Sequence, residues 1–498
     1  MSIQKLEVEM KTIKYHLYAF LFIVCLVSFN LAAQVKEIPV TTSSKEALNF
    51  FLTGRDKFEN QEIVAASSLF DKAIEKDPSF ALAYLYHAQS GGGFKVFREN
   101  LDKAVSLADK VSSGEKLEIL FNQAFADGNG QKQKEYLDQL LSTFPFDKRV
   151  QEIAGEYLYN INDFQNALAH FTKAKEIDNN FAPVFNMIGY CQSALNNYPA
   201  AEEAFQTYIK LVPDKPNPYD SYAELLLKMG KYDESIAQYK KAFEKDPLFT
   251  TSLAGIGNNY IFKGDYTTAR KYFQDYYDKS PNVNGKFDAL YQKATSFIHE
   301  GKPEEAVNTF NEYRTLAENE KLVTNQINSY AFEGFTVSEA GNPKKGKEYF
   351  EKAIDLLGKS ELPDATKENL TVNSMLWRFY YLTANNELDK AQAQSNVCKT
   401  KIESRKNPGE EMFFNSMEGF LEFKKGDYDK AIKYFAEDNS QNPLTWYYTA
   451  QAYSKKGDKD NSDKYLDKIA KWNVNSLDLA FVRKNAIDEI KNEMSVTR

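Results

Sequence analysis

The stretch Gly255-Ile-Gly-Asn-Asn-Tyr-Ile-Phe-Lys-Gly-Asp-Tyr-Thr-Thr-Ala-Arg-Lys-Tyr-Phe273 decides the fold of this 498-residue chain. Its apolar residues recur at helical spacing on both sides of Gly264, and glycine ends helices because it accepts the left-handed backbone conformation. Gly257 and Ala269 are small enough to let two helices approach closely, and the ring of Phe273 fills the space that they leave. The stretch therefore predicts a hairpin of two helices.

The same pattern returns along the chain with a period of 34 residues, which indicates a repeat protein. The small residue of the first helix is found at Gly155, Gly189, Ala223 and Gly257. The second helix carries a small residue and then an aromatic one, at Ala167 and Phe171, Ala201 and Phe205, Ser235 and Tyr239, and Ala269 and Phe273. One hairpin cannot bury its own apolar face, so neighbouring hairpins must stack. We therefore predict an all-α solenoid of tandem helix-turn-helix repeats.

This register resembles that of the tetratricopeptide repeat family, which has Gly, Tyr, Gly, Ala and Phe at the corresponding places. It returns near the start of the chain at Gly54, Ala66, Phe70, Ala73 and Pro78. Near the end it returns at Gly419, Gly426, Ala431, Phe435 and Pro443, with Trp446 at the family's tryptophan position. The resemblance implies about ten units over most of residues 45–470, stacked in a right-handed superhelix. Residues 71–276 also look like the arrays fused to bacterial transcription regulators and kinases, although this chain shows neither of those domains.

Departures from the period divide the chain into segments. We predict an N-terminal repeat region at 34–90, a degenerate or inserted helical segment at 91–146, a regular array at 147–320, a longer-period array at 321–474 and a capping helix at 475–498. Within 91–146, three glycines at 91–93 predict a break, and helices are expected at 100–111, 113–126 and 131–144. A solenoid needs a polar cap at its open end.

The first 33 residues have the order of a signal peptide. Lys5, Lys11 and Lys14 precede an apolar run at 15–29, and Ala33 follows as a small residue for cleavage. That run is shorter than the roughly 20 residues of a spanning helix. We therefore expect an exported protein, periplasmic or associated with the cell envelope, and an uncleaved membrane anchor is the alternative.

Composition excludes several classes of function. The chain has 62 basic and 70 acidic residues, a net charge of −8 and no basic run, which argues against a nucleic-acid partner. With 3 cysteines and 4 histidines it offers neither a disulfide framework nor clustered metal ligands. Cys191 and Cys398 fall at packing positions and predict buried thiols. His87, His170 and His299 are scattered, so we predict no metal site, no cofactor and no catalytic residue.

In the tetratricopeptide repeat family, certain positions of each first helix line a concave groove, and the resemblance carries that role to particular residues here. The predicted partner-binding residues are Asn186, Tyr190, Asp220, Glu224, Asn258, Phe413 and Phe420. Glu152 and Glu156 also hold such positions, and their charges would repel an acidic peptide, so a neutral or basic one is favoured. Phe413 and Phe420 fit either apolar anchors for a partner or packing against a neighbouring helix.

These observations predict an exported scaffold that binds another protein or a peptide through its concave groove, in a cell-envelope assembly. Two alternatives stay open. A soluble binder of a small ligand or glycan would show a discrete pocket with converging polar groups. An enzyme would show several carboxylates with shifted pKa values in one cleft. The sequence does not determine the oligomeric state.

Overall fold

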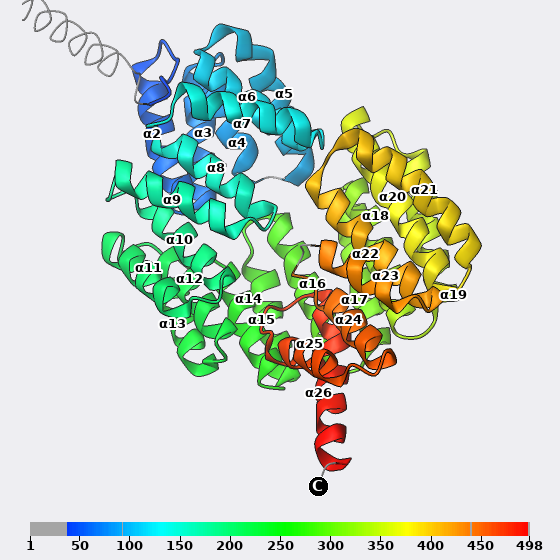
Figure 1. Ribbon diagram of the computed structural model, residues 1–498. Helices are drawn as coiled ribbons and strands as arrows, with labels where there is room; N and C mark the ends of the chain where they lie inside the picture. The colour runs from blue at the N-terminus through cyan, green and yellow to red at the C-terminus, as the bar shows by residue number, and fades with distance from the viewer. Residues whose placement is uncertain (1–36, 92, 439–440, 497–498) are drawn as a thin grey trace, which may run out of the picture.

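The computed structural model describes residues 37–91, 93–438 and 441–496, so the predicted signal peptide lies outside the described residues. In this part the protein holds α-helices, one 3-10 helix and no strand (Figure 1). In chain order the helices are α2 (Lys45–Glu59), α3 (Ile63–Lys76), α4 (Ala81–Gln89), α5 (Gly93–Leu107), η1 (Ala108–Lys110), α6 (Ser113–Ala126), α7 (Gly130–Thr143), α8 (Lys148–Asn160), α9 (Phe164–Ile177), α10 (Ala182–Ala194), α11 (Tyr198–Leu211), α12 (Asn217–Lys228), α13 (Tyr232–Lys245), α14 (Thr251–Phe262), α15 (Tyr266–Lys279), α16 (Val283–His299), α17 (Pro303–Asn319), α18 (Val323–Glu339), α19 (Pro343–Lys359), α20 (Asp364–Ala384), α21 (Leu388–Arg405), α22 (Pro408–Lys425), α23 (Tyr428–Glu437), α24 (Pro443–Lys455), α25 (Lys459–Lys471) and α26 (Leu477–Val496).

Consecutive helices pair into hairpins from α2 with α3 to α24 with α25, and successive hairpins stack. This is the all-α solenoid of tandem helix-turn-helix repeats, with a right-handed superhelix, that the sequence predicts. The segment 91–146 continues the stack, because α5 pairs with α4 and α6 pairs with α7. The helix expected at 100–111 begins earlier, at Gly93, and ends at Leu107, where η1 follows. Within the described part, no helix combines the length and apolarity that crossing a membrane requires.

The hairpins are held together by an aromatic ring packed against a small residue. In the hairpin of α10 and α11, a Cβ atom on Gly189 would lie 2.6 Å from the ring of Phe205, which is fully buried. In the hairpin of α8 and α9, a Cβ atom on Gly155 would lie 2.5 Å from the ring of Phe171. Real Cβ atoms do not approach carbon atoms this closely. The ring therefore requires glycine opposite it, as the sequence pattern indicates.

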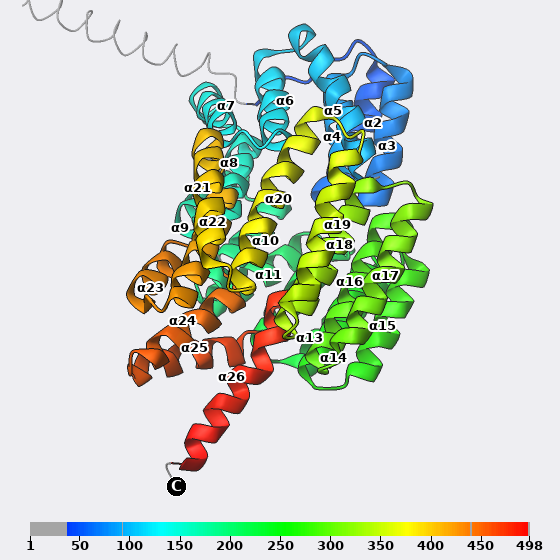
Figure 2. The ribbon, with the colours of Figure 1, turned by 90° about the vertical axis from the view of Figure 1, so that its right-hand side faces the viewer.

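The solenoid also makes contacts between repeats that are far apart in sequence. Figures 1 and 2 show α20–α22, in yellow and orange, returning toward α6–α8, in cyan. Asn369 Nδ2 donates to the carbonyl oxygen of Ala126 over 3.1 Å. Asn162 Nδ2 lies 3.6 Å from the sulfur of Met412. The superhelix thus curves far enough for its last third to contact its first third.

The helix predicted to cap the array at 475–498 corresponds to α26. α26 packs on α16, α24 and α25, and its last turns extend away from the body (Figure 2). The segment that leads into it runs along the inner face of the middle repeats. Asn475 Nδ2 donates to Asn258 Oδ1 and to Gln292 Oε1, each over 2.9 Å, and Tyr232 donates to Asn473 Oδ1 over 3.1 Å. The chain itself therefore occupies part of its own groove.

We expect Gly189→Ala to lower the free energy of unfolding by about 1–3 kcal/mol, because the added methyl group forces the Phe205 ring out of its buried position. Gly358→Ala is the matched control, since that helical glycine has no other atom near the added carbon. The control should gain stability or change little, by up to about 1 kcal/mol. Chemical denaturation followed by circular dichroism measures both, and equal effects of the two substitutions would contradict the packing argument.

Candidate functional site

The structure distributes the predicted partner-binding residues over several places. The structure places Asn186 in a pocket between α4, α6, α8 and α10, and it places Phe413 and Phe420 in a second, aromatic pocket. Asn258 is half-buried and accepts the hydrogen bond from Asn475. The remaining three, Tyr190, Asp220 and Glu224, lie together on α10 and α12.

That third group is a hydrogen-bonded cluster. The hydroxyl of Tyr190 donates to Glu224 Oε2 over 2.6 Å, and Ser252 Oγ donates to Asp220 Oδ1 over 2.6 Å. Burial, followed by the charge of Glu224, raises the pKa of Asp220. The surrounding protein, which displaces water from its carboxylate, also raises the pKa of Glu224, although its side chain is partly open to solvent. These side chains therefore satisfy one another, which fits a role in joining two repeats.

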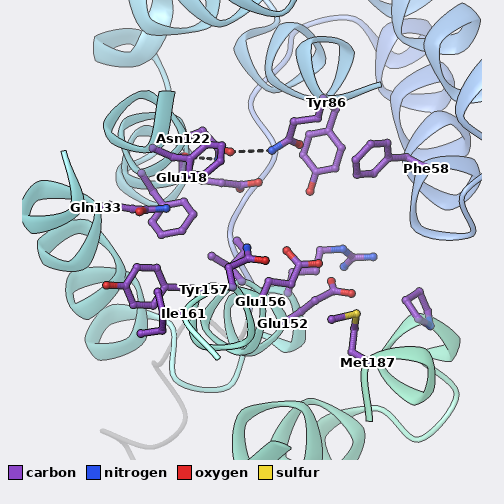
Figure 3. A pocket seen from close by; sticks show the side chains of 18 of the residues that line it. Phe58, Tyr86, Glu118, Asn122, Gln133, Glu152, Glu156, Tyr157, Ile161 and Met187 are labelled. Atoms are coloured by element: carbon purple, nitrogen blue, oxygen red, sulfur yellow. Dashed lines mark hydrogen bonds between the residues drawn. The ribbon is translucent and has the colours of Figure 1, made fainter. Parts of the chain in front are cut away.

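The largest candidate site is a cavity of about 450 Å³ on the inner face, which we call the acidic pocket (Figure 3). Four first helices, α4, α6, α8 and α10, form most of its walls, and the end of α2 and the starts of α7 and α22 complete them. Glu152 and Glu156 project from the same face of α8, because residues four apart lie one helical turn apart. Figure 3 shows their carboxylates on one side of the cavity, with Tyr86 and Glu118 on the other.

Negative charge exceeds positive charge in the acidic pocket. Arg149 is the only basic residue among the described lining residues, and its Nε donates to Glu59 Oε1 over 2.7 Å. That pair neutralises both groups. No other hydrogen bond or ion pair in the described chain reaches the carboxylates of Glu118, Glu152 or Glu156. The pocket thus contains three glutamates that no hydrogen bond or ion pair within the described chain satisfies, although the charges of Arg55 and Arg149 act on Glu118 from nearby.

Burial shifts the titration of these three glutamates. The side chain of Glu118 is only 8% exposed, and burial together with the charge of Asp147 raises its pKa to about 7. Burial and then the charge of Glu156 raise the pKa of Glu152. Burial also raises the pKa of Glu156, whose side chain is open to the cavity but is surrounded by protein beyond it. Each pKa rises because an ionised carboxylate without a partner costs free energy in such surroundings.

Aromatic and amide side chains complete the acidic pocket. The rings of Phe58 and Tyr86 pack edge to face with their centres 5.6 Å apart. Gln89 Nε2 donates to Asn122 Oδ1 over 2.8 Å. The Oδ1 atom of Asn186 is buried and has no hydrogen-bond partner. Carboxylates and a free amide oxygen between aromatic rings are the groups that bind a cationic nitrogen.

Other chemistry has less support in the described residues. No group of three or more His, Cys, Asp or Glu side chains lies in an arrangement that could hold a metal ion there. Cys191 and Cys398 are free, buried thiols, as predicted, and burial raises the pKa of Cys191 to about 12. His299 contacts Asn475, and burial lowers its pKa to about 4. These groups are therefore structural.

Sequence reasoning found part of the acidic pocket and missed the rest. Glu152 and Glu156 were recognised as acidic groove positions, because they belong to a regular repeat. Glu118 and Tyr86 lie at or near the irregular segment 91–146, where no register assigns a face to each residue. The charged Glu118 among apolar neighbours on α6 was the available signal.

Comparison with known proteins agrees with the repeat assignment. Residues 223–284, 288–317 and 445–474 match family models described as tetratricopeptide repeat. The chain is similar to a TPR repeat-containing protein of Methanocaldococcus jannaschii, with 26% identity over 345 residues, which is 65% of this chain and 56% of that protein. It is also similar to tetratricopeptide repeat protein 13 of Homo sapiens, with 29% identity over 179 residues, 34% of this chain and 20% of that protein. The chain thus spans less than two thirds of either relative.

Two solved structures are similar over shorter or looser alignments. A tetratricopeptide repeat protein from Parabacteroides merdae aligns with a TM-score of 0.35 and 15% identity, over 56% of this chain and 96% of that one. MamA from Desulfovibrio magneticus aligns with a TM-score of 0.28 and 18% identity, over 32% of this chain and 92% of that one. The residues of the acidic pocket lie outside all three segments that match the family models.

The raised pKa of Glu118 predicts a pH-dependent gain in stability from Glu118→Gln. The pKa of Glu118 is about 4.5 in the unfolded chain and about 7 in the folded one, so folding favours its neutral form. The free energy of unfolding therefore falls as the pH rises from about 4.5 to about 7, where Glu118 becomes ionised. The substitution should therefore stabilise the protein by about 2–3 kcal/mol more at pH 8.5 than at pH 5. Denaturation at the two pH values measures this, with exposed Glu304→Gln as the control. A loss of stability at pH 8.5 would contradict the assignment.

Proposed function

We propose that this chain is an exported scaffold and that the acidic pocket binds a positively charged side chain of a partner protein. The chain contains tetratricopeptide repeats, and repeats of this kind form extended binding surfaces for other proteins. The signal-peptide order of residues 1–33 supports export. A bacterial cell envelope, with the partner in an envelope assembly, is the setting that fits such a signal.

The observation that carries this proposal is the carboxylate of Glu118. It is buried, borders a cavity and has no partner, although a buried charge without a partner costs free energy. Glu152 and Glu156 add two more carboxylates on the opposite side of the same cavity. An arginine or lysine side chain entering the cavity would supply the missing charge and hydrogen-bond donors. The pocket therefore favours a basic residue over a neutral or acidic one.

The rim of the acidic pocket supports a peptide as the ligand. Phe125 lines the pocket and its side chain is 60% exposed, which is unusual for phenylalanine. It also borders a shallow hollow that continues from the pocket past Asn407 and Gly409 to Phe413. Exposed aromatic rings next to a buried charge are typical anchors of a protein interface. A segment with a basic residue flanked by apolar ones fits this surface.

A free organic cation is the second candidate ligand, because the acidic pocket is a discrete cavity with converging polar groups. The same carboxylates also meet the condition for an enzyme, several shifted pKa values in one cleft. The described lining contains no Ser, Thr, Cys, His or Lys, so carboxyl acid–base chemistry is the reaction type left to it. We propose binding because unpaired charge, rather than a paired acid and base, is what the site presents.

We expect an acetylated and amidated Leu-Arg-Leu peptide to bind at pH 8, and Glu152→Gln with Glu156→Gln to weaken it about tenfold or more. Affinity should rise from pH 6 to pH 8 as the carboxyl groups lose their protons. The matched control is Glu304→Gln with Glu305→Gln, which removes two exposed charges. Calorimetry measures each affinity, and equal binding of the neutral citrulline peptide would overturn the proposed charge recognition.

The source of the ligand is tested in cells with a photo-cross-linking amino acid in place of Phe125. A cross-linked protein that disappears when Glu118→Gln is added supports the scaffold. A cross-linked protein that is recovered equally with Glu118→Gln contradicts the pocket as its anchor. Tight binding of a diamine by the purified protein, without a cross-linked partner, would favour the free cation.

A further inference from the structure

A second cavity, of about 280 Å³, lies between α18, α20, α22, α24 and the start of α26. We call it the aromatic pocket, because rings form most of its wall. Its rings include Phe332, Phe335, Trp377, Tyr380, Phe413 and Phe420. Several of them contact one another, as with Tyr380 and Phe420, whose centres are 6.0 Å apart in a stacked arrangement. Phe413 is 40% exposed and marks the opening.

Most polar groups in the aromatic pocket are already bonded within the protein. The hydroxyl groups of Ser416 and Thr445 both donate to Asp438 Oδ2. Asn442 Oδ1 accepts from the backbone amides at the start of α24. The hydroxyl of Tyr380 donates to Glu339. A ligand would therefore meet rings and few free donors or acceptors from these residues.

The carboxylate of Asp478 is the exception. It lines the aromatic pocket from the first turn of α26, and no hydrogen bond or ion pair in the described chain reaches it. Burial, followed by the negative charges of Glu339 and Asp438, raises its pKa to about 7. The charge of Lys424 acts on Glu339, whereas no ion pair within the described chain reaches Asp478. The ammonium of Lys424 lies over the Phe420 ring, 5.3 Å from its centre, so one ring of this set already contacts a cation.

We propose that the aromatic pocket binds an organic cation with an apolar body, such as a quaternary ammonium group. Ring faces attract a cation through their electron density, and a carboxylate next to them supplies the opposite charge. A neutral apolar ligand would bury Asp478 without a partner, and an anion would be repelled by it. The two pockets share only α22, whose first residues Pro408 and Gly409 border the acidic pocket, and the groups that carry this proposal lie outside the acidic pocket, so it stands independently of the proposed function.

Choline is the probe, and 3,3-dimethylbutan-1-ol is its neutral counterpart of the same shape. Choline should bind saturably at pH 8.5, where Asp478 is ionised, and change the fluorescence of Trp377. The alcohol should bind about tenfold more weakly or not at all. Trp377→Phe should abolish the fluorescence change, and calorimetry should still detect choline.

Asp478→Asn should weaken choline at least about tenfold, because it removes the charge and keeps the shape. Asp488→Asn is the matched control, since Asp488 is exposed on the same helix, and it should leave the affinity unchanged. Phe413→Leu, at the exposed rim, should also weaken choline. Equal affinity for choline and the alcohol, or no effect of Asp478→Asn in a folded protein, would overturn the proposal. Glu118→Gln should not alter the Trp377 signal, which separates this result from the acidic pocket.

Discussion

The packing of an aromatic ring onto a glycine is the contact on which the rest of the structure depends. Where Phe171 and Phe205 cover Gly155 and Gly189, the two helices of a hairpin come closer than any side chain would allow. Because this contact is repeated, each hairpin is rotated by nearly the same small angle relative to the one before it. These rotations curve the array into a superhelix, and the curvature creates an inner face. Both candidate pockets form where residues from several helices converge.

Curvature also explains the shifted titration of the inner carboxyl groups. Side chains that would be separated by water on a straight array are brought together and shielded from bulk solvent on a concave one. Glu118 comes from α6 and Glu152 from α8, and each lies near negative charges that its own helix does not carry. The fold keeps these groups although their ionisation costs stability. Groups that lower the stability of the fold in this way are typical of binding sites.

The sequence predicted the fold more fully than the sites. Asn186 is one of the predicted groove positions, and its amide oxygen lies unbonded at the acidic pocket. Asn258 had the same kind of assignment, yet the chain's own Asn475 occupies it. The register assigns a face to each residue, but it cannot tell which part of that face another segment of the chain will cover. Asp478 lies beyond the last repeat, so no register applied to it.

The sequence by itself determined the helices, their pairing and their stacking, because these depend on contacts between residues less than one repeat apart. Small and aromatic residues at fixed spacing are sufficient to specify such contacts. Only the tertiary structure decided how the array closes, with Asn369 against the carbonyl of Ala126 and Asn475 among the middle repeats. These contacts join residues more than two hundred positions apart, and they depend on small rotations summed over many repeats. The two pockets depend on these summed rotations, so only the folded structure reveals them.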